Sequence, residues 1–192
     1  KNLEQSVAER TRELEAANQK LEEHAVTDAL TGLYNRKELN RRMKEHDPYL
    51  ARKGGGSSDY VVSVAYLDLD NFKHYNDTYG HGYGDQLLKT AADTLRANTR
   101  PYDLLFRLGG DEFLIIMPES DLETAGQIVE RIRGCFNSVS SSTAQEEPMI
   151  TVSIGLTSSG YQPGVKLEEL IQSADAALLK AKAQGKNQIS FH

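Results

Sequence analysis

The sequence predicts an α+β domain, in which helices cover a mixed and mostly antiparallel sheet, behind an N-terminal helical stalk. Two apolar runs, 104–108 and 113–117, flank Gly109 and Gly110. Two residues that tolerate positive φ between such runs indicate a tight β-hairpin. A β-branched, mostly apolar run at 61–67 is typical of a central strand. Between these runs, longer segments carry apolar residues at helical spacing.

The stalk is predicted over residues 1–25 as a coiled coil. Residues 3–24 are rich in Glu, Arg, Gln and Ala and contain neither Gly nor Pro, which favours one continuous helix. Its seam positions alternate by four and three, as in a parallel dimer: Leu3, Arg10, Ala17 and His24, with Val7, Leu14 and Leu21. Arg10 and His24 weaken this seam, so a single amphipathic helix is the alternative. The abrupt start indicates a piece of a longer protein with an upstream sensor domain.

The second domain is expected over residues 26–192 and alternates in type. Helices are predicted at about 36–52, 83–98, 122–139 and 167–184, with short helical turns around 72–79. Gly185 is expected to close the last helix. Strands are predicted at 60–69, in the hairpin, at 149–156 and, as a short edge strand, at 188–191. The stretches 54–58 and 140–143 are predicted loops.

Composition excludes several classes of protein. The chain has 192 residues, 39% of them hydrophobic, which suffices for one domain with a core and an appendage. Its net charge of −6 argues against sequence-independent binding of nucleic acid. No apolar stretch approaches the roughly 20 residues that span a bilayer, so we expect a cytoplasmic fragment without membrane contact. A membrane tether elsewhere in a longer protein stays open. Cys135 is the only cysteine, which rules out an intrachain disulfide.

Two acidic elements predict a metal site. Asp111 and Glu112 follow the glycine turn directly, where a carboxylate has little positional freedom. Asp68 and Asp70 follow the predicted central strand, and the carboxyl ends of strands are where α/β sheets usually bind ligands. Asp68 and Asp111 are therefore expected to converge on a hard cation such as Mg²⁺. A solvated turn is the alternative for the glycine motif, and capping of the next helix is the alternative for Asp70.

Several motifs in a fixed order make the chain resemble a GGDEF domain, the catalytic module of diguanylate cyclases, over roughly residues 26–192. They are DALTGLYNR at 28–36, LDLDNFK at 67–73, NDTYGH at 76–81, GD at 84–85, RLGGDEF at 107–113 and AKAQGKN at 181–187. Their order and spacing together are highly specific. Leu179 departs from the family, which commonly has tyrosine there. The resemblance implies the palm-like α+β fold of nucleotide cyclases and polymerases.

The resemblance also implies a reaction: two GTP molecules form cyclic di-GMP and two pyrophosphates, each 3′-hydroxyl attacking the other nucleotide's α-phosphate. Two ions per active site, Mg²⁺ or Mn²⁺, would neutralise the triphosphate and activate the hydroxyl. Motif matching implies Asp68, the Leu69 carbonyl and Asp111 as ligands, and Asp111 as proton acceptor. A metal-bound carboxylate is a poor base, so activation by the metal is the expected dominant effect. Glu112 receives a less defined catalytic role, because a regular strand turns it to the opposite face.

Residues of the same motifs are expected to hold GTP. Lys73 matches the lysine that stabilises the transition state. Asn76 and Asp85 match the guanine readers, and an amide and a carboxylate suit the purine edge. The other matched positions are Phe72, His81, Arg107, Gly109, Gly110, Lys182 and Lys186.

Each of these assignments has a structural alternative. Lys182 and Lys186 are four apart and would share a helical face toward the β- and γ-phosphates, but a solvated lysine face is the alternative. Asp85 is also a candidate N-cap for the following helix. His81 beside glycines could be turn structure. Arg107 could pair with Glu112 or with phosphate.

A second nucleotide site is implied next to the hairpin. Arg100 and Asp103 match the family's Arg-x-x-Asp product-inhibition site, where the arginine fork suits guanine or phosphate. Arg131 of a neighbouring domain would add a secondary contact. A surface Arg–Asp pair is the alternative.

The expected assembly is a homodimer, because one domain binds one GTP and the reaction joins two. Two other classes of function compete with the enzyme. A catalytically silent receptor for GTP or cyclic di-GMP is disfavoured by the intact Asp68, Lys73 and Asp111. A coiled-coil scaffold leaves the acidic and glycine motifs unexplained.

Overall fold

The computed structural model describes residue 7 and residues 10–12, 26–45, 61–138, 150–159 and 166–192. Of the predicted stalk it describes only residue 7 and residues 10–12, which are helical. The coiled-coil prediction therefore lies outside the described residues, as do the predicted loops at 54–58 and 140–143.

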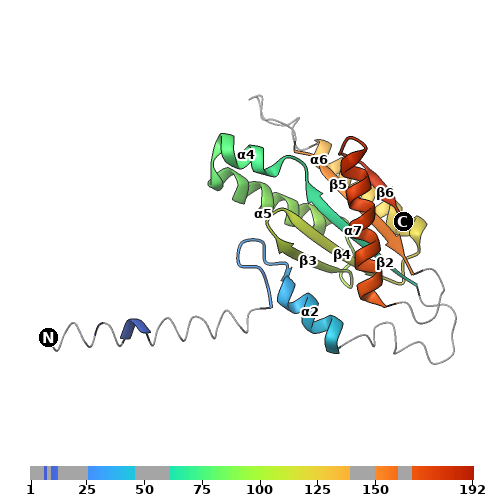
Figure 1. Ribbon diagram of the computed structural model, residues 1–192, viewed down its shortest axis with the longest axis horizontal. Helices are drawn as coiled ribbons and strands as arrows, with labels where there is room; N and C mark the ends of the chain where they lie inside the picture. Colours follow the sequence, from blue (N-terminus) through green and yellow to red (C-terminus); the bar gives the residue numbers. More distant parts are fainter. Residues whose placement is uncertain (1–6, 8–9, 13–25, 46–60, 139–149, 160–165) are drawn as a thin grey trace.

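Six strands of the described chain form one mixed sheet, in the order β1-β3-β4-β2-β5-β6 (Figure 1). The three central pairings, β3 with β4, β4 with β2 and β2 with β5, are antiparallel. The two edge strands pair in parallel, β1 with β3 and β6 with β5. The predicted mixed and mostly antiparallel sheet is confirmed. The strands are β1 (Tyr34–Asn35), β2 (Val62–Leu69), β3 (Leu104–Gly109), β4 (Glu112–Pro118), β5 (Val152–Ser158) and β6 (Ile189–Phe191).

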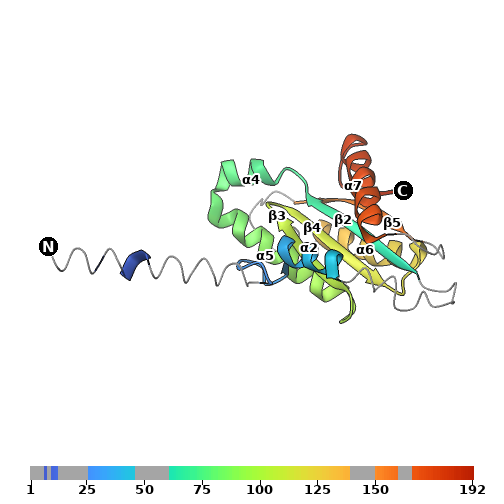
Figure 2. The same ribbon diagram turned by 60° about the horizontal axis from the view of Figure 1, so that its bottom comes forward.

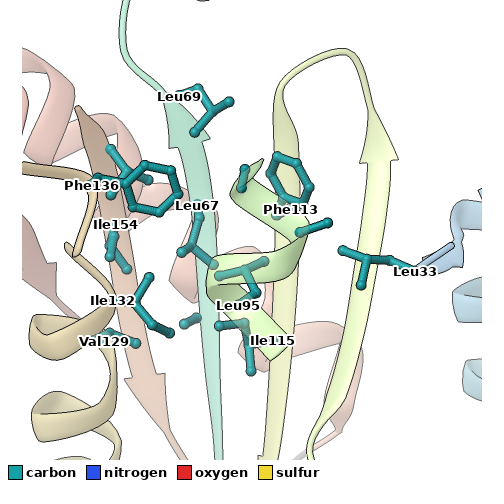
Figure 3. Close-up of a cluster of buried hydrophobic side chains, with 14 of the residues drawn as sticks. Leu33, Leu67, Leu69, Leu95, Phe113, Ile115, Val129, Ile132, Phe136 and Ile154 are labelled. Atoms are coloured by element: carbon teal, nitrogen blue, oxygen red, sulfur yellow. The ribbon is translucent and has the colours of Figure 1, made fainter. Parts of the chain in front are cut away.

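Helices cover both faces of this sheet (Figures 1 and 2). One face packs against α5 and α6, and Figure 3 shows its buried side chains, among them Leu67, Phe113 and Ile154. The other face packs against α2 and α7 through residues such as Val64 and Leu114. The described helices are α2 (Arg36–Glu45), α4 (Phe72–Tyr79), α5 (His81–Asn98), α6 (Leu122–Ser138) and α7 (Leu167–Ala183). None of them is both long enough and apolar enough to cross a bilayer.

The structure differs from the sequence prediction at β1, α5 and β5. Strand β1 was not predicted, because two residues are too few to show a period. Helix α5 begins at His81, two residues before the predicted start, with Gly80 as its N-cap. Strand β5 begins at Val152 and runs to Ser158, so it lies later in the chain than the predicted 149–156. Its extent is set by pairing with β2, which a local pattern does not encode.

Glu38 is a buried acid of α2 whose ion pairs lie within the same helix. Its side chain is 2% exposed and accepts hydrogen bonds from Arg41 Nε at 2.8 Å and Arg42 Nε at 2.6 Å. The Arg41 hydrogen bond is the main reason why the Glu38 pKa falls to about 2, with Arg42 helping and burial opposing.

We expect Glu38→Gln to lower the free energy of unfolding by about 2 kcal/mol, because hydrogen bonds to a charged group are lost. The folded pKa lies below the unfolded one, so this contribution is present above about pH 4.5 and disappears as the pH falls toward 2. Urea unfolding at pH 7 and pH 3 measures both effects. Asp93→Asn is the control, since its pair with Arg96 is 76% exposed on the aspartate side and should matter little. An equal loss in both variants would contradict this role of Glu38.

Candidate active site

The β3–β4 hairpin turns on Gly110 and Asp111. Gly109 pairs with Glu112 across the turn, and the register shifts between Arg107 and Gly109. Gly109 has a φ of 143° and Gly110 a φ of 53°, which glycine adopts readily. The turn thus lies one residue later than the two glycines suggested. Asp111 belongs to the turn, whereas Glu112 opens β4.

The turn brings Asp111 to the end of β2, beside Asp68. The Leu69 amide donates a hydrogen bond to the Asp111 carbonyl at 3.3 Å, which ties the turn to the strand end. Asp68 is 8% exposed, and its Oδ2 lies 2.8 Å from Lys182 Nζ on α7. Two strand ends and one helix therefore gather two carboxylates and an ammonium group at one edge of the sheet.

Negative charge is concentrated at this edge. Burial raises the pKa of Asp68, the charge of Asp111 raises it further, and the hydrogen bond from Lys182 opposes both. Burial also raises the pKa of Asp111, against the effects of its own backbone amide and of Lys182. Two partly buried carboxylates that repel each other form a suitable place for a cation.

The described residues contain no cluster of three or more His, Cys, Asp or Glu side chains that could hold a metal ion by themselves. Magnesium is commonly held by one or two carboxylates together with substrate phosphates. Asp68 and Asp111 fit that pattern, with the Leu69 carbonyl as a further hard oxygen donor.

Glu112 lies directly opposite Asp68 in the β2–β4 register and so shares its face of the sheet. The sequence predicted that Glu112 would lie on the face opposite to Asp111 if both belonged to a regular strand. That prediction does not apply, because Asp111 is part of the turn. The Glu112 carboxylate is 40% exposed and lies 3.4 Å from Arg36 Nη2. Burial, with a smaller effect of the Glu112 charge, raises the pKa of neighbouring Tyr66 to about 12.

Arg107 does not pair with Glu112, so that alternative is wrong. Its Nη1 lies 3.0 Å from Asp28 Oδ1, and its Nη2 donates to the Gly110 carbonyl at 2.8 Å. These contacts hold the turn from the side of β3. The Arg107 guanidinium is mostly enclosed, with 13% of its side chain exposed.

Lys182 and Lys186 do not share a helical face, because α7 ends at Ala183. Lys186 follows the helix with a φ of 64°, and its Nζ donates to Asn71 Oδ1 at 2.6 Å. Both lysines nevertheless reach residues 68–71 at the end of β2, Lys182 at Asp68 and Lys186 at Asn71. Lys182 thus meets Asp68 from the helix, and Lys186 reaches Asn71 from the turn that follows the helix.

The predicted guanine readers lie on neighbouring helices. A side chain at Gly84 of α5 would collide with Asn76 of α4, since a Cβ atom at Gly84 would overlap the Asn76 amide oxygen. Gly84 therefore allows Asn76 to pack closely against α5, one residue before Asp85. The N-cap alternative for Asp85 is wrong, because Gly80 occupies that position.

The other predicted substrate residues of this region differ in exposure. Lys73 and His81 are exposed. Phe72 is 8% exposed and belongs to the core on the α5 and α6 face, so GTP could meet it only through its backbone.

The Arg100–Asp103 motif forms a turn before β3. The Asp103 carboxylate accepts a hydrogen bond from the Arg100 backbone amide at 2.7 Å. Because Asp103 is only 7% exposed, the motif is not a simple surface pair. The other oxygen, Asp103 Oδ1, is buried without a hydrogen-bond partner. Arg100 Nη1 lies 3.3 Å from Ser120 Oγ. Arg131 donates to the Asn98 carbonyl at 2.6 Å and so supports the end of α5 just before this turn.

Two residues at the site received no site role from the sequence, and for Asp70 the sequence kept both a metal role and capping of the next helix open. Asp28 and Arg36 stand in the first motif but hold Arg107 and Glu112, 79 and 76 positions away. Asp70 neither caps the next helix nor faces solvent. Asn71 occupies the N-cap position of α4 without a side-chain cap, while Asp70 bonds to β5 and to the turn after α7. Motif order was the only sequence signal for these contacts.

Known proteins resemble this chain over most of its length. A family model described as diguanylate cyclase, GGDEF domain, matches residues 25–188. The diguanylate cyclase DgcM of Escherichia coli is 39% identical over 89% of this chain and 39% of its own length. The diguanylate cyclase DgcP of Pseudomonas aeruginosa is 37% identical over 86% of this chain and 24% of its own length. The chain thus spans less than half of either relative.

Among solved structures, the coiled coil and GGDEF domain of DgcB from Caulobacter crescentus, in complex with c-di-GMP, superimposes with a TM-score of 0.77 at 31% identity. The match covers 100% of both chains. In this chain one edge of the six-stranded sheet carries the signature turn, Asp68 of β2, Lys182 of α7 and Lys186 after α7. The chain therefore belongs to the GGDEF domain family of diguanylate cyclases.

Proposed function

We propose that this chain joins two GTP molecules into cyclic di-GMP and releases two pyrophosphates. The observation that carries the proposal is the meeting of Asp68, Asp111 and Lys182 at one sheet edge. Two carboxylates and a cation are the groups that the transfer of a nucleotidyl group requires. The relatives named as diguanylate cyclases support it, and the proposal concerns the domain that they share with this chain.

Each half of the reaction forms one P–O bond and breaks another. The 3′-oxygen of one GTP bonds to the α-phosphorus of the other, and the bond from that phosphorus to the β-phosphate oxygen breaks as pyrophosphate leaves. The same step with the roles exchanged closes the ring. Asp111 assists as the acceptor for the hydroxyl proton, while activation of the hydroxyl by the metal is the dominant effect, because a metal-bound carboxylate is a poor base.

The residues that would hold the proposed two Mg²⁺ or Mn²⁺ ions are Asp68, Asp111 and, through its carbonyl, Leu69. When bound, the ions supply charge neutralisation and lower the pKa of the attacking hydroxyl. Lys182 would bind the triphosphate, because its ammonium group lies beside Asp68 at the same edge of the sheet.

The remaining residues bind and orient the substrate. Lys73 stabilises charge at the transferred phosphate, and Lys186 joins Lys182 at the β- and γ-phosphates. Asn76 and Asp85 read the guanine edge, and polar readout of this kind rejects adenine strongly once the bound base covers both groups. Glu112 assists catalysis beside Asp68, and Arg107 holds the hairpin turn. Further contacts to GTP come from backbone or nearby groups of Phe72, His81, Gly109 and Gly110.

Two chains are needed, because each binds one GTP. We propose that the stalk at residues 1–25 brings two domains face to face and passes on the signal of an upstream sensor. The cytoplasm, where the substrate GTP is made, stays the predicted compartment.

The test is to incubate the purified chain with GTP and Mg²⁺ and to separate the nucleotide products by chromatography. We expect cyclic di-GMP, with two pyrophosphates per product, and no cyclic product from ATP. Conversion of GTP to GDP or GMP alone would contradict the proposal.

We also propose that Arg100 and Asp103 bind the product, with Arg131 adding a contact from the neighbouring domain. The half-buried Arg100 supplies a donor fork at this turn, and Asp103 holds the Arg100 backbone by accepting its amide hydrogen. The description of the DgcB structure as a complex with c-di-GMP supports product binding in the family.

Arg100→Ala should weaken cyclic di-GMP binding about tenfold to 100-fold, since a charge-assisted bidentate contact is lost. It should raise the product yield and leave GTP affinity unchanged. Calorimetric titration with each nucleotide measures this, with Lys89→Ala, an exposed cation on α5, as the control. An unchanged affinity for cyclic di-GMP would remove Arg100 from the product site.

A further inference from the structure

Asp70 is an almost fully buried carboxylate, 3% exposed, and both of its oxygens are engaged. Oδ1 accepts from Ser153 Oγ at 2.6 Å. Oδ2 accepts from Thr151 Oγ1 at 2.7 Å and from the Asn187 backbone amide at 3.0 Å. One carboxylate thus joins the end of β2 to β5 and to the turn that follows α7.

That turn has an unusual backbone. Gly185, Lys186 and Asn187 have φ values of 115°, 64° and 46° in succession. Lysine in the left-handed region is disfavoured and persists only where the surroundings fix it. Two further hydrogen bonds hold the turn besides the one from the Asn187 amide to Asp70. The Lys186 amide donates to the Ala181 carbonyl at 3.1 Å. Arg133 Nη1 donates to the Asn187 side-chain oxygen at 3.1 Å.

The turn determines where Lys186 points. With this backbone, Lys186 Nζ reaches Asn71 Oδ1 at 2.6 Å, while Lys182 Nζ reaches Asp68 Oδ2 at 2.8 Å. Residues 68–71 therefore contact both lysines and, through Asp70, the turn next to Lys186. Asp70 is the member of this segment that faces inward and holds the turn.

We propose that Asp70 is a positioning residue, whose buried carboxylate fixes the 185–187 turn so that Lys186 meets the β- and γ-phosphates of the substrate. The inference rests on the proposed function of the site. Asp70 acts through Lys186 and does not hold the metal, because its buried carboxylate is directed toward β5 and the 185–187 turn, where donors hold both of its oxygens. A hydroxyl or amide donor occupies each of them.

Asp70→Asn tests this assignment, because the amide keeps the shape but loses one acceptor. We expect the KM for GTP to rise about tenfold with a smaller change in kcat. The Kd for GTP should rise likewise, whereas the Kd for GMP, which lacks the β- and γ-phosphates, should stay the same. The Mg²⁺ concentration for half-maximal rate should also stay the same. A raised Mg²⁺ requirement, or an equal loss of GTP and GMP affinity, would overturn the assignment.

A double-mutant cycle with Lys186→Ala shows whether Asp70 acts through that lysine. In the Lys186→Ala background, Asp70→Asn should add little to the GTP KM, and additive effects would contradict the proposal. Ser63→Ala is the matched control for lost stability. Ser63 is a buried residue on the same strand, and its hydroxyl donates to the Ser120 carbonyl at 2.7 Å. It should leave the initial-rate GTP KM unchanged.

If Asp70→Asn does not fold, Thr151→Val and Ser153→Ala each remove a single donor to the carboxylate. Each should raise the GTP Kd severalfold relative to the GMP Kd, and unchanged ratios in both would contradict the proposal. The ratio of the GTP Kd to the GMP Kd can be measured without turnover. A parent chain that makes no product would refute the proposed function, whereas the GTP-to-GMP ratio would still decide the role of Asp70.

Discussion

Asp111→Asn should lower the rate of cyclic di-GMP formation by about 10³-fold and leave the fold intact. Asp111 stands on the turn itself, where the Leu69 amide fixes its backbone at the end of β2. Removing its charge removes a proposed metal ligand and the proton acceptor together. Stabilisation of charge by a metal amounts to several kcal/mol, and each 1.36 kcal/mol corresponds to about a factor of ten in rate.

The stability of this variant separates chemistry from folding. Burial raises the pKa of Asp111, so its charge costs free energy in the metal-free fold at neutral pH. Thermal unfolding without metal should therefore occur at the same temperature as in the parent or at a higher one. Asp93→Asn, on exposed α5 surface, should change neither rate nor stability. Full activity of Asp111→Asn would remove the hairpin from the mechanism.

Asp68→Asn should lower the rate by about 10²-fold to 10³-fold and abolish stabilisation by Mg²⁺ and GTP. A ligand that binds only the folded chain raises the free energy of unfolding in proportion to the logarithm of its concentration over Kd. The parent should therefore unfold at rising temperature as Mg²⁺ and GTP are added. The variant should not, because Asp68 lies in the proposed metal site. A parallel rise in both proteins would contradict this role.

The metal-free chain adds a test by pH. The pKa of both Asp68 and Asp111 is raised on folding, so the folded chain binds these protons more tightly than the unfolded one. Their contribution to stability therefore grows as the pH falls from neutral and is complete below the unfolded value near 3.9. This sign is opposite to that of Glu38. The dependence should be weaker in Asp68→Asn, measured by urea unfolding between pH 7 and pH 4.

The central part of the fold could be predicted because its signals are local. Glycines between two apolar runs indicated the hairpin, and β-branched residues indicated β2. Strand β1 could not be predicted, since its two residues form a strand only by pairing with Phe106 and Arg107. The lysine pair shows the same limit. Spacing of four suggested a shared helical face, but α7 ends at Ala183 and a turn with positive φ carries Lys186.

The site residues divide in the same way. Asp68 and Asp111 could be named because each follows a recognisable strand or turn. The partners of Asp70 could not, since Thr151 and Asn187 lie 81 and 117 positions away. The Asp28 partner of Arg107 lies 79 positions away. Such contacts depend on how the sheet and helices pack, so a local pattern carries no record of them.

The dependence of rate on protein concentration tests most directly whether each chain supplies half of an active site. At saturating GTP and Mg²⁺, the initial rate of cyclic di-GMP formation per chain should rise with concentration. It should level off where sedimentation shows the chain to be dimeric. A constant rate per chain across concentrations at which the chain is monomeric would contradict the account. Absence of cyclic di-GMP at the highest concentration, with Asp111→Asn indistinguishable from the parent, would contradict it as well.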